Sequence, residues 1–329
     1  MKEQKTDKSP IRVALLLLLA VLASCGADES LPADGGVLRL LQVEVEEGAG
    51  TATRAAVTEI SQLNVYATTE AHSLYDATKP LILYALSGGS WNADDAPVIA
   101  GNALLYACYP PVSAVANRTD GNHTVPVTVS ATAGFLAAEQ PDYLYGVSPA
   151  TETAPVIATS VNRVISLRME HALAKVSFRI VKSASANEDA LRLTELKIQG
   201  GTNRLQAGTG TMNLKNGVLN GLPSTSVLTL ANEAAPITLN EQQATPNVTC
   251  LVAPMTGQET VLSFRLKVCI NGEPAADAHV FETKSITAQW EAGRHYVYQI
   301  TVDKMGGSLS SVKIDNWKSD ANQNTSIGI

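Results

Sequence analysis

An alternation of apolar and polar residues with a period of two constrains this chain most strongly. In "VLSFRLKVCI" the apolar residues Leu262, Phe264, Leu266, Val268 and Ile270 occupy every second position. Serine, arginine, lysine and cysteine fill the positions between them. Side chains on a strand point alternately to its two faces, so this pattern predicts a half-buried antiparallel strand.

The same alternation recurs elsewhere, and turn residues separate the runs. It places Val176, Phe178 and Ile180 on one face of "AKVSFRIV", and the tyrosines, Ile300 and Val302 on one face of "HYVYQITVD". The pairs Asn216-Gly217 and Asn271-Gly272 suit tight turns that need a positive φ.

Because no stretch sustains a helical period, the sequence predicts an all-β protein, most simply β-sandwiches. A chain of 329 residues suggests about two domains once a leader is removed. Weak periodicity gives way to strong alternation near "ATSVNRVISLRMEHALAKV". We therefore expect an N-terminal sandwich over residues 55–165 and a C-terminal sandwich over residues 166–329.

The N-terminus has the three regions of a secretory signal. Lysines and Arg12 precede the apolar run 13–22, which is too short to cross a bilayer, and Leu-Ala-Ser leads into Cys25. The exit resembles a lipoprotein signal peptidase site. We expect residues 1–24 to be the signal peptide, Cys25 to carry the acyl chains, and the acidic pair Asp28-Glu29 to direct export to the outer surface. Two or more acyl chains anchor a protein stably where one does not.

Charge and cysteine usage exclude other classes. The net charge of −7 offers no basic face, so nucleic acid is not expected as a partner. Beyond Cys25 the chain has Cys108, Cys250 and Cys269, too few for a disulfide framework. By alternation Cys269 points away from the apolar face of its strand and Cys250 into its own, so we do not predict that they pair.

No motif predicts an enzyme, a metal site or a cofactor. The five histidines are scattered singly, and the glycine-rich stretch "GGTNRLQAGTGTMNLKNG" lacks the helix and lysine of a phosphate loop. Serines beside glycines do not form a nucleophile elbow. His171, in "MEHALAKV", fits a structural or capping role better than a functional one.

The segment before the first predicted domain combines a strand with a cleavable link. In "LLQVEVEEG" the alternation places Leu41, Val43 and Val45 on one buried face. The Gly/Ala/Thr link that follows contains a single basic residue, Arg54, and exposed links of this kind are preferred sites of proteolysis. We predict cleavage between Arg54 and Ala55, with an incidental surface arginine as the alternative. Withdrawal of residues 25–54, the prosegment, would uncover an apolar groove and unpaired strand edges.

The order of motifs resembles the fimbrillin family, the type V pilins of Gram-negative anaerobes. The resemblance rests on the lipoprotein leader, "TATRAAV", "GGSW" before "ALLYACYPP", "MEHALAKVSFRI", "CLVAPMTGQ" and "WEAGRHYVYQITV". It implies two transthyretin-like β-sandwich domains, export by the lipoprotein machinery to the outer membrane, and cleavage by an arginine-specific surface protease. It also implies assembly with other pilin subunits by strand exchange, and adhesion at the cell surface as part of a pilus.

Two questions stay open at this level. Val312 and Ile314, on one face of a C-terminal strand, are candidates for the donated strand, yet that strand could equally complete the C-terminal sandwich. The second function considered is a permanently anchored surface lipoprotein that binds glycans. Its candidate stacking platforms are Trp91, Tyr143 and Tyr145, although a tryptophan after a Gly-Gly turn is more often a core residue.

Overall fold

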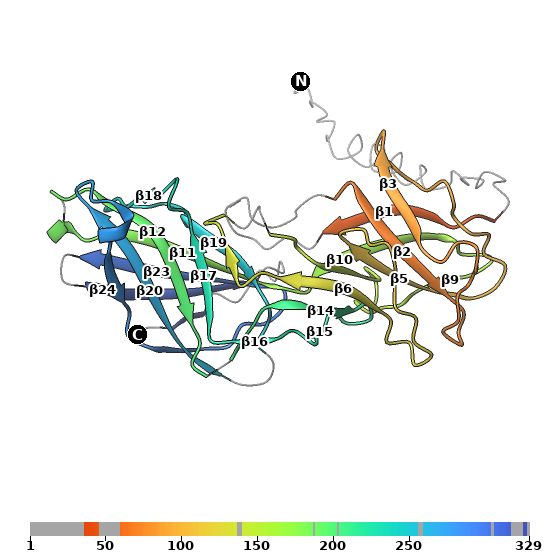
Figure 1. Cartoon of the computed structure of the whole chain (residues 1–329). Helices are drawn as coiled ribbons and strands as arrows, with labels where there is room; N and C mark the ends of the chain where they lie inside the picture. The colour runs from red at the N-terminus through yellow and green to blue at the C-terminus, as the bar shows by residue number, and fades with distance from the viewer. Residues whose placement is uncertain are drawn as a thin grey trace, which may run out of the picture. The chain divides into compact units, whose positions relative to one another are not determined.

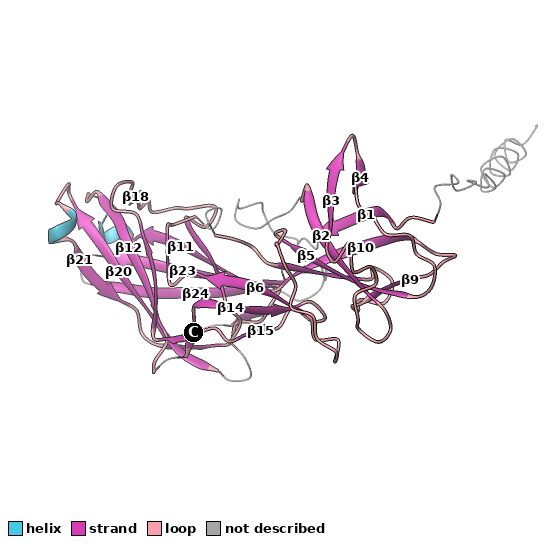
Figure 2. Ribbon diagram, turned by 45° about the vertical axis from the view of Figure 1, so that its right-hand side comes forward, coloured by secondary structure: helices cyan, strands magenta, loops and turns pink. Residues whose placement is uncertain are grey.

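The computed structural model describes residues 36–45, 60–136, 140–186, 188–202, 204–255 and 259–303, and the backbone of residues 306–316 and 325–327. Strands dominate these residues, and the helical segments are two short 3-10 turns, η2 (Ala184–Ala186) and η3 (Ala275–Asp277) (Figure 2). The all-β prediction is confirmed. All of the described strands lie within residues 37–329, which cluster as one unit.

The first large sheet collects strands from the N-terminal half (Figure 1). Its path, in spatial order, is β1 (Arg39–Val45), β10 (Val164–His171), β8 (Leu144–Val147), β5 (Ala103–Tyr109), β2 (Gln62–Thr68), β3 (Ile82–Ser87) and β4 (Ser90–Asn92), with β9 (Val156–Ala158) beside β5. β1 and β4 are the two edges of this path, and they are in contact with each other. The sheet therefore curls until its edges meet at β1.

Two further sheets face each other across the core of the C-terminal half. One has the order β19 (Val248–Val252), β11 (Ala174–Lys182), β23 (Arg294–Asp303), β24 (Gly306–Asn316) and β25 (Thr325–Ile327). The other has the order β21 (His279–Glu282), β20 (Thr260–Ile270), β12 (Leu191–Gln199), β17 (Val227–Ala231) and β7 (Thr132–Ala133), with β18 (Ile237–Thr238) beside β12 and β22 (Ile286–Ala288) beside β20.

Small sheets connect segments that are distant in sequence. They are β15 (Leu219–Asn220), β14 (Gly208–Asn213) and β6 (Thr124–Val129), and the pair β13 (Leu205–Gln206) and β16 (Ser224–Thr225). β6 and β7 precede residue 165 but pair with β14 and β17, and β10 spans that position. The division of the chain at residue 165 stays a prediction.

The predicted core faces lie where the alternation placed them. Leu262, Phe264, Leu266 and Val268 of β20 are buried in the same cluster as Phe178 of β11. β11 departs from the expected half-buried antiparallel strand, because Lys175 and Ser177 on its other face are buried as well and β23 pairs with it in parallel. The described cysteines are Cys108, Cys250 and Cys269. All three are buried, and none forms a disulfide with another.

The aromatic motif near the C-terminus has a structural role. The buried Trp290 donates a hydrogen bond from Nε1 to the Tyr298 hydroxyl, at 2.9 Å. Tyr298 in turn contacts the rings of Phe178 and Phe264. Because buried indole and phenol groups need polar partners, the Trp290–Tyr298 bond allows both rings to fill the core between the sheets.

Turn residues also conform to expectation. Asn271 and Gly272 have φ of 51° and 86°, and Gly217 has φ of 68°. Glycine and asparagine adopt this left-handed backbone at little cost, which is why they occupy these turns.

Candidate functional site

Residues 36–45 are the described part of the predicted prosegment. Within them β1 lies at the edge of the first sheet and pairs in parallel with β10 (Figure 1). Further backbone contacts hold the start of the strand. The Leu38 N–H donates to the Pro97 carbonyl at 2.9 Å, and Val37 forms a β-bridge with Val98. This segment is therefore held both by β10 and by residues 97–98.

Two leucines of the prosegment are part of the hydrophobic core. Leu38 is 1% exposed and Leu40 is 4% exposed, and both belong to the cluster that contains Tyr84, Ile165 and Leu167. Val43 and Val45 are partly buried and pack against the same cluster. We call the surface that β1 covers, formed by Tyr84, by residues 97–98 and by Ile165 and Leu167 of β10, the β1 groove.

The predicted burial of Leu41 is wrong. Leu41 is 69% exposed, because the pairing with β10 shifts between Leu40 and Gln42. A β-bulge inserts one unpaired residue, and here that residue is Leu41. The buried positions are thus Leu38 and Leu40 before the bulge and Val43 and Val45 after it. The adjacent leucines at positions 40 and 41, which interrupt the alternation, were the signal for this bulge.

A buried tyrosine contacts the backbone of the prosegment. The hydroxyl of Tyr84 donates to the Leu38 carbonyl at 3.0 Å, and burial raises the pKa of Tyr84 well above its usual range. A phenol in such a place needs an acceptor, and the acceptor here comes from Leu38, the residue before β1. This contact does not depend on which side chain stands at position 38.

Tyr84→Phe tests that contact. We expect the free energy of unfolding to fall by about 0.5–1.5 kcal/mol, because the Leu38 carbonyl loses a buried donor while the packing of the ring is kept. Tyr109→Phe is the matched control, since Tyr109 packs against the same cluster and its hydroxyl has no hydrogen-bond partner among the described residues. Urea unfolding of the two variants measures the difference, and equal losses would contradict the role given to the Tyr84 hydroxyl.

The other predicted site residues fall into two groups. Cys25, Arg54 and Ala55 lie outside the described residues, so their roles stay predictions. Val312 and Ile314 lie on β24, whose backbone pairs with β23 so that they stand opposite Tyr298 and Tyr296. β25 pairs with β24 in turn.

The candidate glycan platforms differ in exposure. Trp91 is partly buried and packs against the cluster of the first sheet. Tyr143 was expected to be exposed, but it is 8% exposed and its hydroxyl bonds to the backbone of Thr128, so it cannot present a ring face to solvent. Tyr145 is half-buried and donates to Glu170 Oε2 at 2.6 Å.

His171 belongs to a buried polar cluster. Its Nδ1 lies 2.9 Å from Asp142 Oδ2, and both side chains are almost fully buried. Lys175 is buried too, and burial lowers its pKa to about 8, against the opposing influence of Asp142. The structural role expected for His171 agrees with this buried contact, whereas Asp142, far away in sequence, gave no signal.

A second buried histidine, His123, predicts a dependence of stability on pH. His123 is fully buried, packs edge-on against the rings of Tyr66 and Tyr106, and accepts a hydrogen bond from the Arg118 N–H on Nδ1. Burial, and then the nearby His72, lower the pKa of His123 to about 4. The imidazole is therefore neutral in the folded protein at neutral pH.

The unfolded chain binds a proton at His123 below about pH 6.5, but the folded chain does so only near pH 4. The stabilisation is complete above pH 6.5 and is lost as the pH falls to 4, by about 2–3 kcal/mol. Urea unfolding of the wild type and His123→Gln between pH 7 and pH 4.5 should show a smaller loss in the variant. An equal loss in both proteins would contradict the role given to His123.

Within the described residues no cluster of three or more histidine, cysteine or acidic side chains is placed to hold a metal ion. No helix in that part of the chain is long and apolar enough to span a membrane.

One family model matches this chain, and its fold is similar to that of solved proteins. The sequence model of the family described as Fimbrillin-like matches residues 51–317. No curated protein matches the sequence significantly. The fold is similar to a fimbrial protein from Bacteroides vulgatus, with a TM-score of 0.56 and 11% identity over 85% of this chain and 100% of the other. It is also similar to a candidate cell adhesion protein from Bacteroides ovatus, with a TM-score of 0.53 and 17% identity over 86% of this chain and 99% of the other.

Proposed function

Because this chain belongs to the fimbrillin-like family, we propose that it is a structural subunit of a cell-surface pilus that serves adhesion. In this proposal the subunit is exported as a lipoprotein, cleaved after Arg54 and polymerised by strand exchange. The observation that carries the proposal is the position of β1: a strand upstream of the predicted cut fills the β1 groove with Leu38 and Leu40.

Once β1 has left, a β1 groove filled by another strand has a lower free energy than an empty one. Each of the two buried leucines contributes about 1.5–3 kcal/mol through the apolar surface it removes from water. Loss of β1 would also leave the edge of β10 unpaired and the Tyr84 hydroxyl without its acceptor. A strand from a second copy can fill the apolar groove, pair with the edge of β10 and supply an acceptor to the Tyr84 hydroxyl. This is the logic of strand complementation.

The groove restricts the incoming strand. It must run parallel to β10, supply an N–H to the Pro97 carbonyl and a carbonyl to Tyr84, and place two large apolar side chains two residues apart. Proline at the position of Leu38 is excluded, because proline has no N–H. Groove and donor are different surfaces of the subunit, so the contact is heterologous and generates a fibre when the rotation does not close.

The C-terminal strand offers a matching sequence. Val312, Ile314 and Trp317 have the spacing of Leu38, Leu40 and Val43, including the extra residue of the bulge. In this register Lys313 takes the place of the exposed Arg39. We propose Val312 and Ile314 as the donated core residues, in which case β24 leaves its pairing with β23 during assembly. The alternative is that β24 permanently completes the C-terminal sheet.

The leader and the cut complete the proposal. Acylation of Cys25 would hold the precursor at the outer membrane, where an arginine-specific surface protease can reach the link. Cleavage after Arg54 separates the subunit from its own anchor, so that growth can continue away from the membrane. Division into sandwiches at residues 55–165 and 166–329 remains part of this proposal.

The N-terminal residue of the protein isolated from cells tests this function. The proposal expects Ala55 in assembled material, and mass spectrometry of the N-terminal peptide identifies it. An acylated Cys25 in every recovered chain would refute the pilin role and favour the second candidate, a permanently anchored lipoprotein that binds glycans. The observation that favours this second candidate is an open hollow lined by Tyr145, Glu152 and Lys215.

A further inference from the structure

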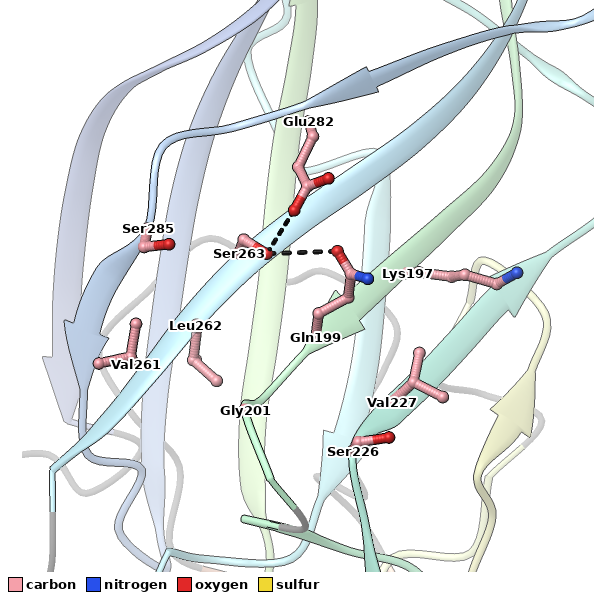
Figure 3. Close-up of a pocket in the computed structure, with 10 residues that line it drawn as sticks. All are labelled: Lys197, Gln199, Gly201, Ser226, Val227, Val261, Leu262, Ser263, Glu282 and Ser285. Carbon is pink, nitrogen blue, oxygen red and sulfur yellow. Dashed lines mark hydrogen bonds between the residues drawn. The ribbon is translucent and has the colours of Figure 1, made fainter.

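Two hollows in the described part of the chain differ in whether their polar groups are already bonded. The larger, of about 550 Å³, lies over β12, β17 and β20 (Figure 3). There Ser263 Oγ contacts both Glu282 Oε1 and Gln199 Oε1, at 2.9 and 3.2 Å. Lys197 lies 3.3 Å from Glu195, and no aromatic residue lines the hollow. This surface therefore lacks an aromatic platform, and Lys197, Glu282 and the Gln199 carbonyl are already engaged.

The smaller hollow, of about 350 Å³, combines unpaired donors with an aromatic wall. Its lining includes Asn122, Lys215 and Asn216 together with Tyr145 and Glu152. Its volume is at the low end of the range, about 300–1,000 Å³, that small-molecule sites occupy. We call it the Tyr145 hollow.

Backbone hydrogen bonds determine the direction of both amides. The Lys215 N–H donates to Asn213 Oδ1, so Asn213 presents its NH₂ group, which donates to Asn122 Oδ1 at 3.1 Å. The Val218 N–H donates to Asn216 Oδ1 in the same way. Each lining amide thus has its oxygen occupied and its NH₂ group unpaired among the described residues.

Hydrogen bonds and ion pairs hold Tyr145 in place. Tyr145 donates to the buried Glu170, and Arg168 bridges Glu170 and Glu152 with contacts of 3.0 Å each. Gly217 packs directly against the Tyr145 ring, since a Cβ at that position would lie 2.3 Å from a ring carbon. The ring is therefore fixed in place before any ligand arrives, which lowers the entropic cost of binding. The Glu152 side chain is 69% exposed and stays accessible to a ligand.

We propose that the Tyr145 hollow binds one neutral saccharide unit of a glycan. Sugar hydroxyls can accept hydrogen bonds from the two amides and from Lys215, and they can donate to Glu152, while the aromatic wall contacts the C–H groups of the ring. Lys215 and Glu152 carry opposite charges, so the lining does not demand a charged ligand. This proposal gives the adhesion role a ligand class, yet binding needs neither cleavage nor polymerisation, so the two proposals can fail separately.

Titration of the full-length protein with methyl glycosides of glucose, galactose and mannose and with N-acetylglucosamine tests the site. We expect the side-chain amide NMR signals of Asn122 and Asn216 to shift saturably with at least one of these sugars. Asn122→Ala combined with Lys215→Ala, both at exposed positions, should weaken binding about tenfold or more, because two hydrogen bonds are lost. Lys215→Arg, which keeps a cationic donor, should retain most of the affinity.

Lys197→Ala, in the hollow of Figure 3, is the matched control and should bind as the wild type does. The proposal is overturned if no sugar gives a saturable shift, or if the control weakens binding as much as the double variant. N-acetylneuraminic acid is titrated in parallel, and a saturable response to it alone would also overturn the proposal, because a carboxylate would then be required.

Discussion

Leu40→Ala will lower the free energy of unfolding by about 2–5 kcal/mol, the range for a fully buried leucine that leaves a cavity. Leu41→Ala, one residue along the same strand, will change it by no more than about 0.5 kcal/mol, because surface substitutions without special contacts have small effects. The difference arises from the bulge, which buries Leu40 and leaves Leu41 69% exposed. Urea denaturation of the uncleaved protein measures both.

This pair of variants isolates the contribution of the prosegment to the core. Both replace a leucine of β1 by alanine, so the change in strand propensity is the same. Similar losses for both would show that the register of β1 against β10 is not the one described. A negligible loss for Leu40→Ala would mean that β1 does not stabilise the fold, and the pilin proposal would lose its physical basis.

Arg54→Ala will abolish fibre formation. Arg54 is the single basic residue between Val45 and Ile60, so an arginine-specific protease has no other target in that link. Without the cut, β1 stays covalently attached to its own subunit and competes with any incoming strand at a very high effective concentration. Electron microscopy for fibres and mass spectrometry for the N-terminus measure the two consequences.

A rescue experiment separates the cut from other effects of the substitution. Arg54→Lys should resist the arginine-specific protease but form fibres after treatment with a lysine-specific protease. Normal fibres from Arg54→Ala cells would contradict the assignment of the cleavage site. Cleavage of Arg54→Lys at this lysine without assembly would show that proteolysis alone does not trigger polymerisation.

The sequence predicted the strands well where alternation is regular, as in β20 and β23, whose apolar faces form the core. It failed at β1, because a single extra residue reverses the faces of a strand and only the adjacent leucines hinted at it. Pairing partners lie far apart in sequence, so the parallel contacts of β1 with β10 and of β11 with β23 gave no local signal.

The candidate site was predictable only in part. The presence of a strand before the predicted cut followed from its pattern. The Tyr84 hydroxyl and the Pro97 carbonyl, however, bond to the backbone of Leu38, and such contacts leave no trace in a residue pattern. The Tyr145 hollow is likewise assembled from three separate segments. Tyr145 was a candidate as an aromatic residue, but the amides that complete the hollow could not be associated with it from sequence.

A covalent lock between β1 and β10 tests the central claim, that the prosegment must leave its groove before a second molecule can enter. Gln42 and Ser166 are paired across the two strands, so their cysteine variants are placed for a disulfide. The described native cysteines are buried and should not interfere. We expect the oxidised double variant to be cut after Arg54 and to stay monomeric, and fibres to form once the disulfide is reduced. Fibres that grow equally fast from the oxidised protein would contradict the account.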